Sequence, residues 1–316
     1  MIVVDSIQKL GPIKSPLYLA IGMFDGVHIG HQAVIEACLN SAENSNGKSG
    51  VLTFWPHPSV VIRPDRAVPQ IMPLESKLWT LDRKGLDYTI VQTFDKDFAQ
   101  LGAEAFAAFL KQHIPNLSTI FVGENFRFGK GRKGDINLLR KEANEVGVHV
   151  VSMEQCKLDG SVVSSTRIRE ELQKGNFNDI RFLLGHPYTV IGKTRKGKQV
   201  GRSIGYPTLN VDWAPELQPP YGVYAARLIC HESGDYEPKQ AFPGIANYGI
   251  RPTYESSNDP VLEVHLFEKT DIGYDADIAV ELLHFIRSEQ KFGSPEQLTA
   301  QIARDVVSAK EILGVG

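Results

Sequence analysis

The chain has 316 residues, of which 42% are hydrophobic and 22% are charged, and its formal net charge is −3. This length allows two domains with cores of their own, and the composition is typical of a globular protein. Because the chain has no excess of basic residues, we expect no nucleic-acid partner. Because it has no apolar run of about 20 residues, we expect no membrane-spanning helix. The N-terminus lacks a signal-peptide pattern, and three separated cysteines, Cys38, Cys156 and Cys230, favour reduced thiols in the cytoplasm. A catalytic cysteine has no motif to support it but stays open.

Strand and helix signals alternate through the first half of the chain. Short apolar runs predict buried strands, and apolar residues at helical spacing predict the helices between them. The alternation predicts a parallel sheet covered on both faces, with ligands beyond the carboxyl ends of its strands. The expected strands are 17–21, 50–54, 88–91, 119–122 and 148–151. A first helix is expected just after the stretch 22–31, and further helices at 75–84, 103–112 and 135–145. Asp135 is the expected N-cap of the last of these.

The turn at residues 22–31 joins the first expected strand to the first expected helix. His28 and His31 are three residues apart on the first helical turn, so we expect their side chains to lie together. Free N–H groups and the helix dipole favour an anion there, and the glycines let a ligand approach closely. The turn therefore suits a nucleotide triphosphate. Taken alone, the two histidines could also be chance neighbours on a surface turn. A zinc site fits less well, because no third Cys, His or carboxylate lies nearby at metal-ligand spacing.

Two more loops should meet at the same edge of the sheet. Pro56 and Pro58 end the second strand. After the fourth strand, residues 123–134 mix basic side chains, glycines and two aromatic rings, Phe126 and Phe128. Exposed rings are unfavourable unless something covers them. A flat ligand carrying a phosphate would satisfy both ring and charge, whereas the alternative is a flexible basic loop.

A helix is expected to begin near residue 165, with Ser165 or Thr166 as its N-cap. An ordinary capped surface helix would explain this pattern. Hydroxyl groups and an arginine at a helix start also make a clamp for a triphosphate. A further helix, 177–184, should end at Gly185. We expect the domain boundary there, with domains 1–185 and 186–316.

The second half is dominated by strand signals. No helix separates these strands, so we expect an antiparallel sheet closed into a small barrel. The expected strands are 188–191, 222–229, 241–247, 261–267 and 278–285, and a terminal helix should span 297–313.

Two stretches of the second half carry candidate chemistry. Residues 197–210 contain glycines that let a loop fold over phosphates, and Thr208 and Asn210 offer neutral oxygen ligands for Mg²⁺. In residues 262–267, Glu263 and His265 should face away from the apolar side chains that alternate with them. The plainer interpretations are a mobile loop and a solvated strand carboxylate.

Together these motifs resemble those of the bacterial bifunctional riboflavin kinase/FMN adenylyltransferase family, also called FAD synthetases. The first half is similar to the HxGH nucleotidyltransferases of the FAD synthetase branch, with Met23 where Asn is common. The matching residues are the run 24–31, the G-x-[DN]-F-x-F-G run at 123–129 and the ISSTxxR run at 163–169 with Val163 for Ile. The second half resembles the riboflavin kinase module at 201–210, 220–224, 249–253, 263–265 and 287–292, with a more basic run at 193–196.

The resemblance implies a Rossmann-like nucleotidyltransferase domain followed by a β-barrel kinase domain with a C-terminal helix. It implies that Glu263 is the catalytic base of the kinase, that His28 and His31 act in adenylyl transfer, and that Thr208 and Asn210 hold Mg²⁺. The residues it assigns to nucleotide binding are Gly22, Phe24, Asp25, Gly26, Gly30, Ser164, Ser165, Thr166, Arg169, Gly201, Arg202 and Gly205. Those it assigns to flavin binding are Pro56, Pro58, Asn125, Phe128 and Arg287.

The expected activity is phosphorylation of riboflavin by ATP to FMN, followed by adenylylation of FMN by ATP to FAD and pyrophosphate. The expected partners are therefore riboflavin, FMN, FAD and ATP, for a monomer or weak homo-oligomer. Two alternatives remain. The first half could be inactive or transfer a nucleotide to another phosphate, as in pantetheine-phosphate and choline-phosphate enzymes. Alternatively, the chain could be a regulator that binds flavin without turnover.

Overall fold

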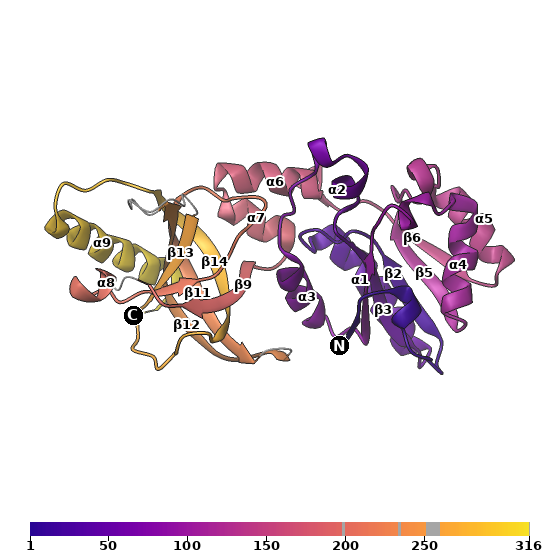
Figure 1. Ribbon diagram of the computed structural model, residues 1–316, viewed down its shortest axis with the longest axis horizontal. Coiled ribbons are helices and arrows are strands. Elements are labelled where there is room, and N and C mark those ends of the chain that lie inside the picture. The colour runs from indigo at the N-terminus through magenta and orange to yellow at the C-terminus, as the bar shows by residue number, and fades with distance from the viewer. Residues whose placement is uncertain (198–199, 233–234, 251–259, 316) are drawn as a thin grey trace. The chain divides into compact units, whose positions relative to one another are not determined.

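The structure is a computed structural model, and it describes residues 1–197, 200–232, 235–250 and 260–315 (Figure 1). The chain forms two compact units. The first comprises Met1–Gln70 and Thr80–Ser165, and the second comprises Ile71–Trp79 and Thr166–Gly316. The second unit thus includes two segments that precede residue 186. The predicted boundary at 185/186, which follows the family's modules, remains a prediction.

The first unit contains a parallel sheet, as predicted, and the sheet has six strands, one more than expected. Its strands are β1 (Ile2–Val4), β2 (Leu17–Ile21), β3 (Lys48–Trp55), β4 (Tyr88–Thr93), β5 (Leu117–Gly123) and β6 (His149–Met153). They are arranged in the order β1-β4-β3-β2-β5-β6, and every neighbouring pair is parallel. The sequence analysis missed β1, because three residues are too few to show a strand period.

Helices cover both faces of this sheet. The helices are α1 (Ile29–Asn44), α2 (Pro58–Ile62), α3 (Leu74–Asp82), α4 (Phe106–His113) and α5 (Ile136–Glu145), with α3 shared between the units. Leu19 of β2 packs with Leu110 of α4 and Leu139 of α5 in one core. Helix α1 contacts β2, β3 and β5, and its Cys38 thiol donates a hydrogen bond to the Tyr18 carbonyl oxygen on β2 (3.1 Å). The prediction of a doubly covered sheet is confirmed.

The topology brings the predicted loops to one edge. Strands β3, β2 and β5 are neighbours, and the turn at 22–28, the prolines after residue 55 and the loop from 124 follow their carboxyl ends. From β2 the chain passes to β3 on one side, whereas β5 leads to β6 on the other. The strand order therefore reverses between β2 and β5, which is where ligands bind in open parallel sheets.

The second unit contains a closed antiparallel barrel, also as predicted. Its strands are β9 (Tyr188–Arg195), β10 (Leu209–Val211), β11 (Gly222–Glu232), β12 (Asp235–Ile250), β13 (Pro260–Leu266) and β14 (Asp277–Ser288). They pair in the order β10-β13-β12-β11-β14-β9, and β9 closes the ring on β10. Strand β10 was not among the predicted strands. The three residues of β10 show no alternation of their own, and only their pairing defines the strand.

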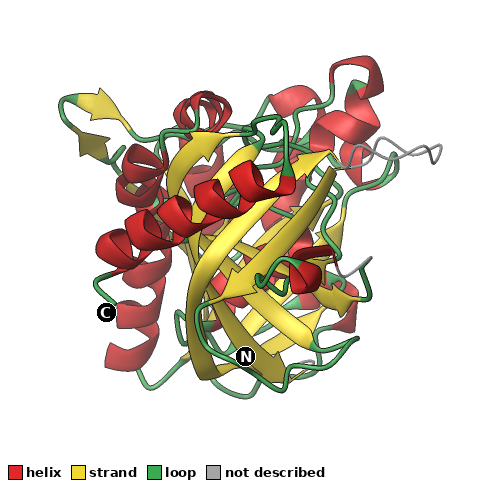
Figure 2. Ribbon diagram, turned by 90° about the vertical axis from the view of Figure 1, so that its left-hand side faces the viewer, coloured by secondary structure: helices red, strands yellow, loops and turns green. Residues whose placement is uncertain are grey.

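One long helix packs against the outside of the barrel. Helix α9 (Pro295–Leu313) contacts β11, β12 and β14, and Figure 2 shows it crossing the barrel strands. Ala309 packs on Val223, Ala225 and Ile245. The remaining elements are α6 (Ser165–Lys174), α7 (Phe177–Leu184), the short α8 (Val200–Ser203) and the hairpin of β7 (Lys157–Leu158) with β8 (Ser161–Val162).

Candidate active sites

The two histidines of the first turn lie together, as predicted. The rings of His28 and His31 stack with centroids 3.5 Å apart and planes 15° apart. His28 is also the N-cap of α1, because its Nδ1 accepts the backbone N–H of His31 at 3.2 Å. A ring nitrogen that accepts carries no hydrogen, so the neutral ring has its N–H at Nε2. The cap thus leaves Nε2 as the donor of His28.

The turn before α1 has an unusual backbone. Phe24 (φ 48°), Gly26 (φ 83°) and Val27 (φ 40°) all lie in the left-handed region, which non-glycine residues rarely occupy. Side chains from other parts of the unit donate hydrogen bonds to the carbonyl groups of this turn. Thr53 Oγ1 donates to the Met23 carbonyl oxygen (3.0 Å), and Gln32 Nε2 donates to the Val27 carbonyl oxygen (2.8 Å).

Gln32 is itself held in place by a lysine. Its Oε1 accepts a hydrogen bond from Lys84 Nζ at 2.7 Å, and partial burial lowers the pKa of Lys84. Gln32, Lys84 and Thr53 could not be recognised from the sequence, because they act on the backbone of the motif and have no motif of their own. Their contacts make the turn a preorganised element.

Two glycines of the turn make room for aromatic rings. A Cβ on Gly30 would lie 3.2 Å from His28 Cε1 and 3.3 Å from His28 Nδ1. A Cβ on Gly22 would lie 3.1 Å from the Phe24 ring, and that ring meets His31 edge-on with centroids 5.3 Å apart. These glycines therefore set the position of the imidazoles, in addition to any approach by a ligand.

The start of α6 is tied to the same turn. Ser165 Oγ donates a hydrogen bond to the backbone carbonyl oxygen of Asp25 at 3.0 Å. Asp25 is only 2% exposed. Helix α6 begins at Ser165, so the position before the helix belongs to Ser164, and the predicted cap at Ser165 or Thr166 is one residue or more too late. Thr166 and Arg169 belong to the second compact unit, and their nucleotide contacts remain predictions.

The aromatic loop after β5 is less exposed than expected. Phe128 is 7% exposed, and its ring lies 5.1 Å from that of Phe106 and 5.5 Å from that of Phe126. A Cβ on Gly134 would lie 2.7 Å from the Phe128 ring, so this glycine lets the loop close over it. Phe128 thus fills the core of its own unit. Asn125 is exposed in the same loop.

Pro56 and Pro58 follow the neighbouring strand β3 and are half-buried. Both prolines, Asn125 and Phe128 therefore belong to the edge of the sheet where ligands bind. Their contacts with flavin remain predictions.

The candidate base of the second half lies in a row of side chains on the outer face of the barrel. Glu263 on β13 is the direct cross-strand partner of Asn210 on β10 and of Asn247 on β12. Its neighbours Leu262 (0% exposed) and Val264 (1%) point into the core, so Glu263 points outward as predicted. Side chains that are direct cross-strand partners have Cβ atoms about 5 Å apart. Glu263 and Asn210 can therefore act on one ligand.

The described residues of the loop between β9 and β10 (196–197 and 200–208) fold closely onto this row. A Cβ on Gly197 would lie only 1.8 Å from Asn210 Nδ2. A Cβ on Gly201 would lie 2.2 Å from the Tyr206 carbonyl oxygen and 3.5 Å from Thr208 Cγ2. Both glycines are thus required by close contacts. The predicted nucleotide ligands Arg202 and Gly205 belong to the same loop and are exposed.

His265, two residues beyond Glu263, anchors the end of this loop. Its Nδ1 lies 2.9 Å from the carbonyl oxygen of Pro207. Since a carbonyl oxygen can only accept, Nδ1 carries the hydrogen. The contact joins the strand of the candidate base to the segment that carries Thr208.

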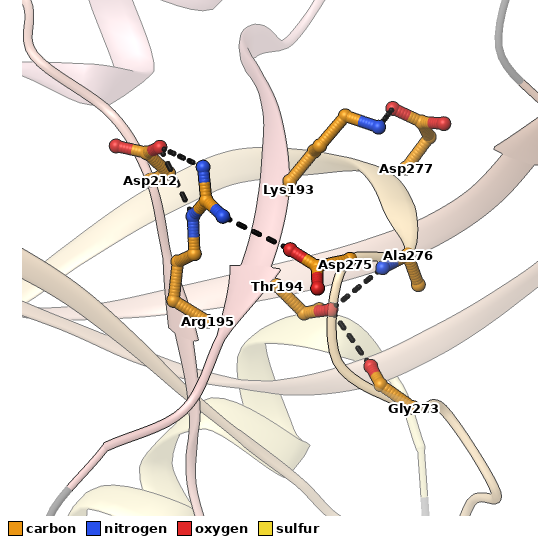
Figure 3. Close-up of polar contacts among 8 residues, drawn as sticks. All are labelled: Lys193, Thr194, Arg195, Asp212, Gly273, Asp275, Ala276 and Asp277. Atoms are coloured by element: carbon orange, nitrogen blue, oxygen red, sulfur yellow. Dashed lines mark hydrogen bonds and ion pairs between the residues drawn. The ribbon is translucent and has the colours of Figure 1, made fainter.

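The basic run at 193–196 is balanced by nearby carboxylates (Figure 3). Arg195 donates to Asp212 (2.9 and 3.2 Å) and to Asp275 (2.9 Å), and Lys193 pairs with Asp277 at 3.2 Å. Thr194 Oγ1 also joins the run to the chain before β14, because it donates to the Gly273 carbonyl oxygen at 2.7 Å. The basic residues that differ from the family pattern therefore join β9 to the residue that follows β10 and to the chain at the start of β14.

Arg287, a predicted flavin ligand, is engaged with α9. Its guanidinium makes three hydrogen bonds of 2.7–3.0 Å to the carboxylate of Asp305, which is 2% exposed. Its flavin contact remains a prediction. Arg251, Pro252 and Thr253 of the second-half motif lie outside the described residues.

The cysteines and the candidate metal ligands bear on two of the alternatives that the sequence left open. All three cysteines are free, and burial raises the pKa of Cys38 to about 11, which keeps it a thiol at neutral pH. Within the described ranges, no group of three or more His, Cys, Asp or Glu side chains could hold a metal. Across the same residues, no helix is both long and apolar enough to cross a bilayer.

Two family models match separate parts of the chain. Residues 11–167 match the family model described as FAD synthetase, and residues 184–313 match that described as riboflavin kinase. The chain is 37% identical over 297 residues to the bifunctional riboflavin kinase/FMN adenylyltransferase of Escherichia coli (strain K12), covering 94% of this chain and 93% of the relative. It is 35% identical to the protein of the same description from Haemophilus influenzae, covering 92% of each.

A solved structure shares the fold over almost the whole chain. A crystal structure described as a macrolide-efflux protein from Streptococcus pneumoniae matches with a TM-score of 0.81 and 27% identity, covering 96% of each chain. Both family models match within one chain, and relatives above 30% identity match over almost their full length. The chain therefore belongs to the bifunctional riboflavin kinase/FMN adenylyltransferase family of flavin cofactor biosynthesis.

Proposed function

We propose that the chain converts riboflavin to FMN in its barrel and FMN to FAD at its parallel sheet, each with one ATP. The observation that carries this proposal is the cross-strand pair of Glu263 with Asn210, in a different fold from the stacked His28 and His31. One constellation contains a carboxylate that can take a proton. The other presents two imidazole rings and the backbone N–H groups of a helix start, which are donors suited to phosphate.

In the kinase step, Glu263 accepts the proton of the ribityl 5′-hydroxyl as its oxygen attacks the γ-phosphorus. The bond from that phosphorus to the ADP oxygen breaks, and FMN and ADP result. An alcohol is a poor nucleophile at neutral pH, so a positioned base contributes about 10²–10⁴-fold. Thr208 and Asn210 present neutral oxygens, which are suitable ligands for Mg²⁺. When bound, Mg²⁺ would neutralise charge on the phosphates of ATP.

In the adenylyl step, a phosphate oxygen of FMN attacks the α-phosphorus of ATP, and pyrophosphate leaves. The second pKa of a phosphate monoester is about 6, so FMN is already anionic and needs no base. The requirement is for donors where charge develops. We assign this role to His28, His31 and the N-terminus of α1, with Ser164 and Ser165 of the same unit as further donors.

The direct test is to incubate the protein with riboflavin, ATP and Mg²⁺ and to separate the flavins over time. The proposal expects FMN to appear first and FAD to follow. FMN alone would indicate a first half that is inactive or transfers nucleotides to another acceptor. No product, with flavin still bound, would indicate a regulator. A cytoplasmic location and a monomeric or weakly oligomeric state remain predictions.

A further inference from the structure

Asn247 belongs to the outward row beside the candidate base, and the sequence motifs do not single it out. It lies on β12 directly opposite Glu263, on the side away from Asn210. Its side chain is half-buried. The row therefore presents an amide, a carboxylate and a second amide on three adjacent strands, in the order Asn210, Glu263 and Asn247.

The other described neighbours of Asn247 on this face offer its amide no hydrogen-bonding side chain. Across the strand pair it faces Val223, which α9 covers. Along β12 it lies between Ile245, which is buried under α9, and Gly249. A Cβ on Gly249 would lie 2.6 Å from the carboxylate of Glu289. Among the described residues, no hydrogen bond involves the side-chain amide of Asn247.

The order of the row gives a direction to the bound substrate. Phosphoryl transfer proceeds in line, so the carbon chain of the alcohol must leave the attacking oxygen on the side away from the γ-phosphate. With the phosphates at Asn210 and the attacking oxygen at Glu263, that side is the side of Asn247. Adjacent strands are about 4.8 Å apart, so one strand spacing carries the chain from the 5′-oxygen to the next hydroxyl groups.

We propose that Asn247 binds the ribityl chain of riboflavin by hydrogen bonds to its hydroxyl groups. This inference rests on the proposed kinase function of the barrel. An amide has one acceptor oxygen and two N–H donors, which matches neighbouring hydroxyl groups that both donate and accept. Asn247 then fixes the 5′-hydroxyl near Glu263 and selects flavins that carry a polyol.

The test compares riboflavin with lumiflavin, which has the same ring system and a methyl group in place of the ribityl chain. Binding is measured by quenching of flavin fluorescence without ATP, in the wild type and in Asn247→Ala. Losing hydrogen bonds worth about 1–1.5 kcal/mol corresponds to roughly a 10-fold change in affinity. We expect the variant to bind riboflavin about 10-fold more weakly and to bind lumiflavin as the wild type does.

The matched control is Asn178→Ala, because Asn178 on α7 contacts His284 and not the row. We expect its riboflavin affinity to equal that of the wild type. Equal losses for riboflavin and lumiflavin in Asn247→Ala, or no loss for either, would overturn the inference. These results are separate from failure of the proposed function, which would appear as no FMN formation by the wild type. Asn247→Ser, which keeps a hydroxyl, should recover part of the riboflavin affinity.

Discussion

The backbone N–H of His31 donates to Nδ1 of His28, so one imidazole both caps α1 and belongs to the candidate adenylyltransferase site. The two roles can be separated by substitution. His28→Asn keeps an N-cap side chain, whereas His28→Ala removes it at a cost of about 1 kcal/mol. Both variants lose the imidazole. We expect both to form FAD from FMN about 10²–10³-fold more slowly, and only His28→Ala to lose stability.

FAD formation from supplied FMN and urea unfolding measure the two effects. Riboflavin phosphorylation is the internal control for folding, and it should be unchanged in both variants. Wild-type rates of FAD formation in His28→Asn would show that the imidazole serves only as a cap.

Gly197 offers a test of the close approach of the loop to Asn210. Because an added Cβ would lie 1.8 Å from the Asn210 amide, Gly197→Ala must displace the loop or that side chain. We expect the variant to lower kcat/KM for riboflavin phosphorylation at least 10-fold, with FAD formation from FMN unchanged. The matched control is Gly273→Ala, where nothing lies within 4 Å of the added atom. Equal activity in the two variants would mean that the loop need not lie against Asn210.

Asp87 makes the stability of the parallel-sheet unit depend on pH. Partial burial acts to raise the pKa of this carboxyl, but hydrogen bonds from Lys48 (2.6 Å) and Ser49 (2.9 Å) outweigh it and lower the pKa. A pKa depressed by folding contributes stability above the unfolded value of about 3.9, and this stability is lost as pH falls through the folded value. We therefore expect Asp87→Asn to destabilise by about 1–2 kcal/mol at pH 7 and by progressively less below pH 4.

Urea unfolding at several pH values measures this difference. The control is Asp5→Asn, since Asp5 and its partner Lys9 are both largely exposed and such pairs contribute little. A deficit in Asp87→Asn that stayed constant down to pH 3 would contradict the assigned cause.

The bond between Arg287 and Asp305 allows a test of whether the arginine contacts flavin itself. Arg287 is 15% exposed and Asp305 2%. Breaking such a pair leaves an uncompensated buried charge, and Asp305→Ala should destabilise the barrel unit by about 3 kcal/mol. If Arg287 acts only by fastening α9, Arg287→Ala and Asp305→Ala should raise KM for riboflavin equally. A larger rise in Arg287→Ala would indicate direct contact with flavin.

Much of the fold was predictable because its elements are long and periodic. The run at 17–21 and the apolar spacing after residue 30 predicted β2 and α1, and the change from alternating to continuous strand signals predicted the barrel. Short elements were missed. Neither β1 nor β10 is long enough to show a period, although β10 carries Asn210.

The candidate sites were predictable only in part. Spacing along one helix brought His28 and His31 together, because a helical turn relates residues three apart. The loop ring of Phe128 was expected to be exposed and is buried, since burial depends on Phe106 from another element. The partners of Glu263 depend on strand register, which no local pattern encodes. Asn247 could therefore be recognised only from the fold.

The central claim, that two independent sites act in sequence, is tested most directly by mixing two defective variants. Glu263→Gln cannot take the ribityl proton, and the double variant His28→Asn/His31→Asn lacks the imidazole donors. Alone with riboflavin and ATP, the first should yield no FMN and the second should stop at FMN. An equimolar mixture should yield FAD, because free FMN passes from one protein to the other. No FAD from the mixture, with both variants folded, would contradict the account.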